Sequence, residues 1–195
     1  MVNQGYDEIL RSTTRLARLT FAAAASSIFL YDQERNALVF EASSGVGEDQ
    51  LVGVEIPHDQ GIAGWVLRSG EPIVVRGASD DSRFDRDFAA QTGLVPEVIM
   101  AAPVEHDGEI LGVLEVLDPQ LESVGDISSI DMLTELATQS CAALRLLTAE
   151  RKRAAMAGAG SQAEALAELL GAGSDARREF AVTELLSAVS KLMSS

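Results

Sequence analysis

The 195-residue sequence predicts an α+β protein, with a central antiparallel sheet flanked by terminal helices and followed by a helical C-terminal extension. Helical periodicity brackets residues 5–148, and the strand-like runs between the two helices are joined by short turns. Strands that follow one another across short turns pair antiparallel. The extension is expected to be helical because 12 of the 47 residues from 149 onward are alanine.

In the first part of the domain, apolar residues recur at helical spacing over 5–20 and predict an amphipathic helix. Runs rich in β-branched and aromatic residues then predict three strands, at 26–32, 37–43 and 51–57. The polar segment DQERN separates the first two strands, which are therefore expected to form a hairpin.

The stretch GIAGWVLRSGEPIVV, residues 61–75, predicts a short helix followed by a fourth strand. Asp59 is expected to cap the start of this helix, since its carboxylate can accept hydrogen bonds from free backbone N–H groups. Gly70 is expected to end it, because glycine adopts the left-handed conformation common at helix ends. The strand is expected to begin at Pro72.

A charged loop then leads to a short helix near 85–92, and a second hairpin follows. Its strands, 97–106 and 109–118, flank Asp107-Gly108, a pair typical of tight hairpin turns. Pro103 cannot donate a ladder hydrogen bond, so a bulge is expected at that residue.

The remaining sequence is expected to be mostly helical. The longest helical pattern spans 126–148 and closes a domain over 5–148. Residues 149–160 are expected to form a linker, and 161–195 a helical extension with a break at the GAGSD segment, 171–175.

The charge of the chain excludes several kinds of partner. Residues 1–148 hold nine Arg, no Lys and 24 acidic residues, whereas 149–195 are neutral, and the net charge is −15. Such a surface repels nucleic-acid phosphates and anionic membranes, so neither is an expected partner. The absence of a signal-peptide pattern and of a long apolar run, together with a single cysteine, predicts a cytoplasmic location.

Three segments in this order resemble the GAF domain family over residues 5–148. They are GIAGWVLRSGEPIVV with the following SDDSRF, then MAAPVEHDGEILGVLEVLD, and the long closing helix. The resemblance implies that the terminal helices cover one face of the sheet, and that the 61–69 helix and the 76–96 segment cover the other face above a pocket. It also implies binding of a small regulatory ligand, or of none, and relay of that state through the terminal helices.

The chain departs from the patterns of three GAF subgroups. Cyclic-nucleotide-binding members carry an Asn-Lys-X-Phe-Asp-Glu pattern that is absent here, where the first lysine is Lys152. GAF-fold methionine sulfoxide reductases use several cysteines, and bilin-binding members attach their chromophore through a loop cysteine. The single Cys141 lies within a predicted helix. We therefore expect a non-enzymatic protein.

No catalytic or metal-binding residue is predicted from the sequence. It contains no nucleophile motif, no phosphate-binding glycine loop and no cluster with zinc-ligand spacing. His58 and His106 lie at predicted turns and are expected to be solvated rather than to ligate a metal or haem. The cofactor, if any, is unknown at this stage.

We expect seven side chains to line the implied pocket, namely Ile62, Trp65, Arg83, Phe84, Phe88, Met100 and Glu115. Trp65, the single tryptophan, either walls this pocket or fills the core beneath its helix. Arg83 lies among interleaved acidic residues, which favour a solvated mixed-charge loop over pairing with an anionic ligand.

Glu115 is unusual because it interrupts the apolar run LGVLEVL. Strand alternation places its side chain on the same face as Val113 and Leu117. A carboxylate on a buried face is costly unless it is paired or hydrated. Glu115 therefore either faces a ligand cavity or lies at a hydrated edge.

The apolar surface of the 126–148 helix is wide enough for two interfaces. We expect a homodimer through the 5–20 and 126–148 helices, with Met132, Leu136, Ala143 and Leu147 at the interface. The alternative is a monomer in which the extension covers this surface. The 161–193 segment is expected to bind a partner protein or to fold back on the domain, and the rival function is a ligand-free scaffold for dimerisation and protein interaction.

Overall fold

The structure is a computed structural model that describes residues 3–120 and 126–171. The described residues form an antiparallel sheet with strand order β3-β2-β1-β6-β5-β4, so the predicted α+β class is confirmed. The strands are β1 (Ala25–Asp32), β2 (Ala37–Gly45), β3 (Glu55–Pro57), β4 (Ile73–Arg76), β5 (Val98–His106) and β6 (Glu109–Leu117).

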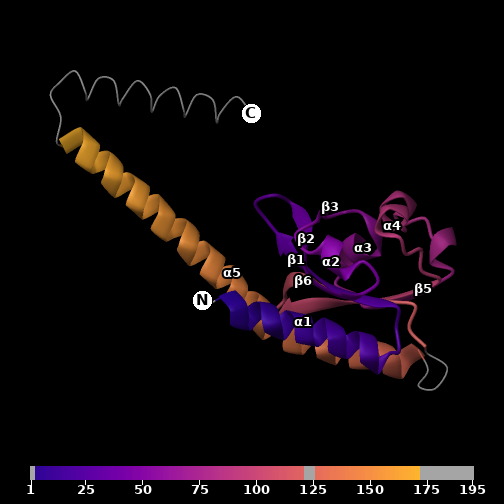
Figure 1. Ribbon diagram of the computed structural model, residues 1–195. Helices are drawn as coiled ribbons and strands as arrows, with labels where there is room; N and C mark the ends of the chain where they lie inside the picture. The colour runs from indigo at the N-terminus through magenta and orange to yellow at the C-terminus, as the bar shows by residue number, and fades with distance from the viewer. Residues whose placement is uncertain (1–2, 121–125, 172–195) are drawn as a thin grey trace. The chain divides into compact units, whose positions relative to one another are not determined.

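Helices cover both faces of this sheet (Figure 1). The helix α1 (Asn3–Thr20) and the part of α5 (Asp126–Gly171) that precedes residue 149 pack on one face. The opposite face carries shorter segments, which are α2 (Glu48–Leu51), α3 (Gly61–Ser69), the 3-10 turn η1 (Ala78–Asp80) and α4 (Arg86–Thr92). The arrangement of the two layers is the one that the family resemblance implies. None of the helices in the described ranges is long and apolar enough to span a membrane.

Two separate cores form because successive strand side chains point to opposite faces. The helix-side core contains Ile28, Leu114 and Val116, packed with Leu10 and Leu133 of the terminal helices. The pocket-side core contains strand residues whose side chains point the other way, among them Phe29, Phe40 and Val113. These pack with Ile62 and Val66 of α3. Each central strand therefore contributes to both cores.

A bulge in β2 changes the alternation near the pocket. The β1–β2 register shifts between Ile28 and Phe29, which pair with Ala42 and Phe40 and leave Glu41 as the extra residue. Phe40 therefore lies in the pocket-side core and Ala42 in the helix-side core. Beyond the bulge, Ser43 pairs with Ser27 and returns to the pocket side.

Two turns follow the sequence prediction closely. Asp107 and Gly108 both have positive φ, 51° and 80°, as the tight turn between β5 and β6 requires. Gly70 ends α3 with φ 72°, and its N–H donates to the carbonyl of Val66 at 2.9 Å. The strand after it begins at Ile73, one residue beyond Pro72.

Three local expectations are corrected. The third strand is limited to Glu55–Pro57, because α2 and a turn with Gly53 at φ 88° occupy the preceding residues. The residue that caps α3 is Gln60 rather than Asp59, and it makes no side-chain cap bond. Pro103 pairs with Val113, and the β5 irregularity falls after it, between Val104 and Glu105.

The predicted linker at 149–160 is wrong, because these residues belong to α5. The segment is rich in alanine and long polar side chains and contains no proline, so helix continues through it despite the cost of about 1 kcal/mol for each interior glycine. The fold nevertheless divides into compact units at the predicted boundary, Met1–Thr148 and Ala149–Ser195. The prediction for 172–195 lies outside the described residues.

The four predicted interface residues have different environments. Ala143 is only 2% exposed and lies in the helix-side core, so its predicted place at a dimer interface is wrong. Leu136 packs partly against the same core, whereas Met132 is 41% exposed. The side chain of Leu147 lies outside those that the structure describes. Sequence periodicity assigned too many apolar residues of this helix to an interface with a second copy, because the core side of α5 is wider than one line of residues.

Gly112 is required where β6 passes β1. A Cβ at Gly112 would lie 1.9 Å from the carbonyl oxygen of Phe29, a contact with backbone that cannot be relieved by a rotamer change. We predict that Gly112→Ala lowers the free energy of unfolding by about 3 kcal/mol or more. Gly108→Ala is the control, because it meets no atom within 4 Å and costs only about 1 kcal/mol through its left-handed φ. Equal stability of the two variants in urea denaturation would contradict the prediction.

Candidate functional site

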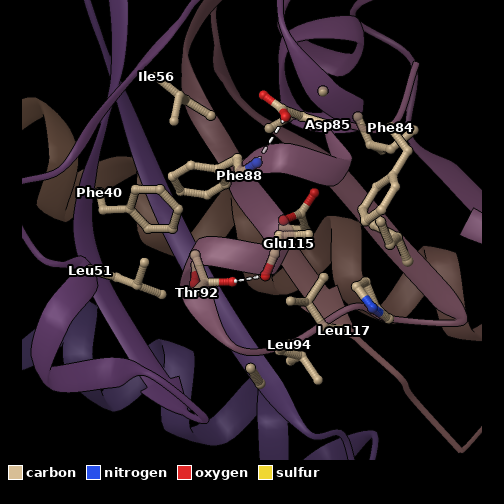
Figure 2. Close-up of a pocket in the computed structure, with 18 of the residues that line it drawn as sticks. Phe40, Leu51, Ile56, Phe84, Asp85, Phe88, Thr92, Leu94, Glu115 and Leu117 are labelled. Atoms are coloured by element: carbon tan, nitrogen blue, oxygen red, sulfur yellow. Dashed lines mark hydrogen bonds between the residues drawn. The ribbon is translucent and has the colours of Figure 1, made fainter. Parts of the chain in front are cut away.

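A cavity of about 80 Å³ lies between the pocket side of the sheet and the helices α3 and α4. Strands β1, β2 and β6 supply its floor, the first turn of α3 supplies one wall, and α4 with the segment after it supplies another. Figure 2 shows these side chains converging from separate elements. The cavity is thus part of the folded domain, and it is small enough that its lining decides what can enter.

Phenylalanine side chains form much of this lining. Phe29 and Phe40 are neighbours on β1 and β2, with ring centroids 4.2 Å apart and planes tilted by 52°. Phe88 of α4 stacks on Phe40, with centroids 5.8 Å apart and an angle of 28°. Phe84, from the loop before α4, adds a fourth ring. Aromatic contacts of this kind fix α4 against the sheet and give the cavity apolar walls.

Most of the polar groups in the lining already have partners inside the protein. The carboxylate of Asp85 caps α4, where it accepts from the N–H of Phe88 at 2.9 Å. The hydroxyl of Thr92 donates to the Ala89 carbonyl at 2.9 Å (Figure 2). The hydroxyls of Ser27 and Ser43 share a hydrogen bond at 3.1 Å.

Glu115 is the exception among the lining side chains that are not exposed. It lies on β6, paired with Ser27 of β1 and Ala101 of β5, and its side chain points into the cavity near Phe88 and Leu117 (Figure 2). Its carboxylate has no hydrogen-bond or ion-pair partner among the described residues. Burial raises the pKa of Glu115 from 4.5 to about 7, because the low-dielectric surroundings disfavour the ionised form. Glu115 thus lines a cavity from a central strand rather than lying at an edge of the sheet.

Four of the seven predicted pocket residues line this cavity: Ile62, Phe84, Phe88 and Glu115. Met100 does not, and its predicted place is wrong. It is fully buried in the helix-side core and pairs with Val116. On β5, Ile99 and Ala101 point to the pocket side. Met100 lies between them and points to the opposite face, so the prediction assigned it to the wrong face of the strand.

Trp65 and Arg83 also lie outside the cavity lining. Trp65 packs against the pocket-side core, and the Arg83 guanidinium lies 4.9 Å from its ring centroid. Arg83 in turn donates to both carboxylate oxygens of Asp81, at 2.8 and 2.6 Å, and this pairing lowers the pKa of Asp81 to about 2. The structure thus places Trp65 as a core residue whose outer face is covered by an ion pair.

Arg83 and Arg86, the two arginines from η1 to the first residue of α4, both have hydrogen-bond partners within the protein. A polar depression beside the start of α3 is lined by Arg68, Arg83 and Arg86. Arg86 donates through Nε to the Ser79 carbonyl at 2.8 Å, and Arg83 is held by Asp81. This agrees with the expected mixed-charge loop. Within the described ranges, no group of three or more His, Cys, Asp or Glu side chains is placed to hold a metal ion.

Sequence reasoning missed Phe29, Phe40 and Ser27. Strand alternation alone would have put Phe29 on the face opposite Ile28, but the bulge that turns Phe40 toward it leaves no recognisable mark in the sequence. Gln60 and Gly61 were also missed, because the helix cap was expected one residue earlier.

Comparison with known proteins now identifies the fold. The model of the GAF domain family matches residues 5–144. The chain belongs to the GAF family. Its sheet order, its two helix layers and its cavity are therefore to be considered as features of a GAF sensory or regulatory domain.

Individual relatives are distant. A probable 3',5'-cyclic phosphodiesterase of Caenorhabditis elegans, pde-5, is 29% identical over 122 residues, 57% of this chain but only 17% of that protein. The GAF domain of a phosphoenolpyruvate-protein phosphotransferase from Coxiella burnetii superposes with a TM-score of 0.65 at 22% identity, covering 75% of this chain and 86% of that one. A free methionine-R-sulfoxide reductase from Neisseria meningitidis gives a TM-score of 0.58 at 21% identity, over 73% and 81% of the two chains. Likeness at this level shows the fold alone.

The pKa of Glu115 leads to a stability prediction. Because the folded-state pKa is raised, the folded protein binds more protons than the unfolded chain between pH 4.5 and 7, and stability falls as pH rises through that window. Glu115→Gln mimics the protonated form. We expect it to equal the wild type below pH 4.5 and to exceed it by roughly 3 kcal/mol above pH 7.

The measurement is chemical denaturation of both proteins across this pH range. Glu105→Gln is the matched control, since Glu105 is exposed on the adjacent strand and lies outside the cavity lining. A stability difference between wild type and Glu115→Gln that does not change with pH would contradict the placement of Glu115.

Proposed function

We propose that this GAF domain is a non-enzymatic sensor that binds a small organic ligand in the cavity beneath α3 and α4. The observation that carries the proposal is a cavity with phenylalanine walls and one carboxylate, that of Glu115, without a protein partner. Ligand sites are concave, mostly apolar and supplied with a few polar groups that orient the ligand. A buried carboxylate is costly unless it is paired or hydrated, and a ligand in the cavity would supply a partner for Glu115.

The same strands connect the cavity with the helix layer. On β1, Ser27 lines the cavity and its neighbour Ile28 lies in the helix-side core. On β6, Glu115 faces the cavity, whereas Leu114 and Val116 pack under the terminal helices. A ligand that shifts these strands changes the packing of α1 and α5, so these helices are the proposed output of the sensor.

The cavity chemistry supports a binding role rather than catalysis. A nucleophilic mechanism requires a nucleophile within hydrogen-bond reach of a base. Among the residues that line the cavity, the hydroxyl of Ser27 has only Ser43 as its partner, and no His or Cys is present. Cys141 lies in the helix-side core, where burial raises the pKa of its thiol.

Cyclic nucleotides are not the proposed ligand, although the name of the C. elegans relative refers to them. A cyclic nucleotide carries a phosphate anion, and the lining offers two carboxyl groups, Asp85 and Glu115, and no Arg, Lys or His. Two acidic groups repel a phosphate in a low-dielectric site.

We further propose a cytoplasmic homodimer assembled through α1 and α5. These helices expose large apolar side chains on the surface that faces away from the sheet, namely Ile9, Leu16, Leu19, Met132 and Leu146. A second copy of the chain, related to the first by a two-fold axis, would cover such a surface. We also propose that a partner protein receives the signal through residues 161–193.

The alternative function is a ligand-free scaffold for dimerisation and protein interaction. The same exposed apolar residues favour it, but a scaffold would bind no ligand in the cavity.

The ligand is tested by filling its site. Ala89 of α4 lines the cavity, whereas Ala90 beside it is exposed. We predict that a compound released from purified wild-type protein on denaturation, or identified in a thermal-shift screen of small organic molecules, binds at least about tenfold more weakly to Ala89→Leu and normally to Ala90→Leu. Failure to find any binder in both measurements would support the scaffold instead.

Assembly is tested by light scattering. Leu16 and Met132 are exposed, so we predict that Leu16→Glu with Met132→Glu gives folded monomers. Thr138→Glu is the control, because Thr138 is also exposed on α5 but adds no apolar surface. It should leave the dimer intact. A monomeric wild-type protein would refute the proposed dimer without any variant.

A further inference from the structure

We infer that the cavity selects small organic ammonium ions, with the ammonium group against the Glu115 carboxylate and the hydrocarbon part against Phe40 and Phe88. The inference rests on the proposed function, because it names the chemical class of ligand for the same cavity. Three features of the lining support it: its charge, the unused hydrogen-bonding capacity of its polar groups, and the position of its aromatic rings.

The charge of the lining has one sign. Asp85 and Glu115 are its ionisable side chains, and neither Arg, Lys nor His lines the cavity. Arg83, a cation on the same loop, is held by Asp81 and stacks over Trp65 outside the lining. A cationic ligand therefore meets no positive side chain within the lining itself, whereas an anion meets two carboxyl groups there and no counter-charge.

Among the lining side chains that are not exposed, the free hydrogen-bonding capacity is that of an acceptor, whereas the Gln60 amide is exposed to water. Asp85 uses one oxygen to cap α4, and Thr92 donates its proton within the same helix. Ser27 is paired with Ser43. An ionised Glu115 offers only acceptor oxygens, which require a donor from the ligand. An ammonium group supplies up to three donors together with the compensating charge, and charge-assisted hydrogen bonds are the stronger kind.

The aromatic rings favour the same ligand. Phe40 and Phe88 form a stacked pair in the wall, and Phe84 lies on the opposite side of Glu115 (Figure 2). Ring faces attract cations, most strongly when the cation is desolvated. The carbon skeleton of an organic ammonium ion gains from burial against the same rings. With a cavity of about 80 Å³, the ligand must be small.

Ionisation of Glu115 makes the selection depend on pH. The groups packed around it are Ser27 of β1, Ala101 of β5 and residues of α3 and α4, of which Asp85 alone is ionisable in the lining. Because the pKa of Glu115 is about 7, a cation must displace a proton from Glu115 at acidic pH, whereas above pH 7 it meets a carboxylate that is already ionised. The affinity for a cation should therefore rise with pH, while that for a neutral ligand should not.

The experiment compares three probes of similar size and different charge, each small enough for the cavity: propylammonium, 1-propanol and propionate. The full chain is titrated with each, and binding is followed by NMR of ¹³C-labelled isoleucine methyl groups, since Ile56, Ile62 and Ile99 line the cavity. The titrations are performed at pH 8 and pH 6 on wild type, on Glu115→Gln, and on Glu105→Gln as the matched control outside the cavity.

At pH 8 we expect propylammonium to bind wild type at least about tenfold more tightly than 1-propanol, and propionate to bind weakest. The advantage of the ammonium should disappear in Glu115→Gln and persist in Glu105→Gln. It should fall by about tenfold between pH 8 and pH 6, where Glu115 is protonated.

Two outcomes would overturn the inference, and they separate it from the proposed function. If 1-propanol shifts the cavity methyl signals and binds wild type as tightly as propylammonium, the cavity is a ligand site but does not select ammonium ions. If none of the probes shifts these signals, the inference fails together with the proposed cavity as a site for small organic molecules. The comparison of probes on wild type holds even if a variant does not fold.

Discussion

Strand β6 lies between β1 and β5 and is covered on both faces, so each of its side chains must suit the layer that it meets. Leu114 and Val116 meet the terminal helices, and Val113 meets α3. Gly112 has no side chain because the carbonyl of Phe29 occupies that space. On such a strand, a carboxylate is tolerated only where the layer that faces it is incomplete and leaves space. Glu115 lies at such a place, because it faces the cavity between the sheet and the helices α3 and α4.

The incomplete layer has a local cause. The segments on the pocket side are short, and α3 and α4 contain nine and seven residues. Short helices bury little surface by themselves and depend on tertiary contacts. The contacts that hold α4 include the Asp85 cap and the stacking of Phe88 on Phe40, both at the edge of the cavity, and a hydrogen bond from Arg86 to the Ser79 carbonyl. The opposite face has long helices and a continuous core, and Arg18 of α1 donates to the hydroxyl of Ser44 on β2.

Most of the fold was predictable from the sequence because the signals were local. The Asp107-Gly108 turn and the Gly70 helix end follow from backbone preferences that a few residues determine. The site was only partly predictable, because side-chain direction depends on strand parity and parity depends on bulges. The Glu41 bulge brought Phe40 into the cavity, and a parity error put Met100 there wrongly. Glu115 was recognisable because a charge within an apolar run needs a physical reason wherever it lies. The helix through 149–160 was missed because its glycines were given more weight than its alanines.

The two walls of the cavity differ in how firmly they are held. Glu115 belongs to a central strand that is paired on both sides and packed against two cores, so it has little freedom to move. Phe88 and Ala89 belong to a seven-residue helix whose contacts include its cap, a hydrogen bond from Arg86 and one ring stack, so this wall is the more yielding one. In the proposed sensor, a ligand of matching charge would therefore act on β6, and through Leu114 and Val116 on the terminal helices, whereas bulk alone would be absorbed by α4. Such a sensor would transmit the chemical identity of its ligand as well as its presence.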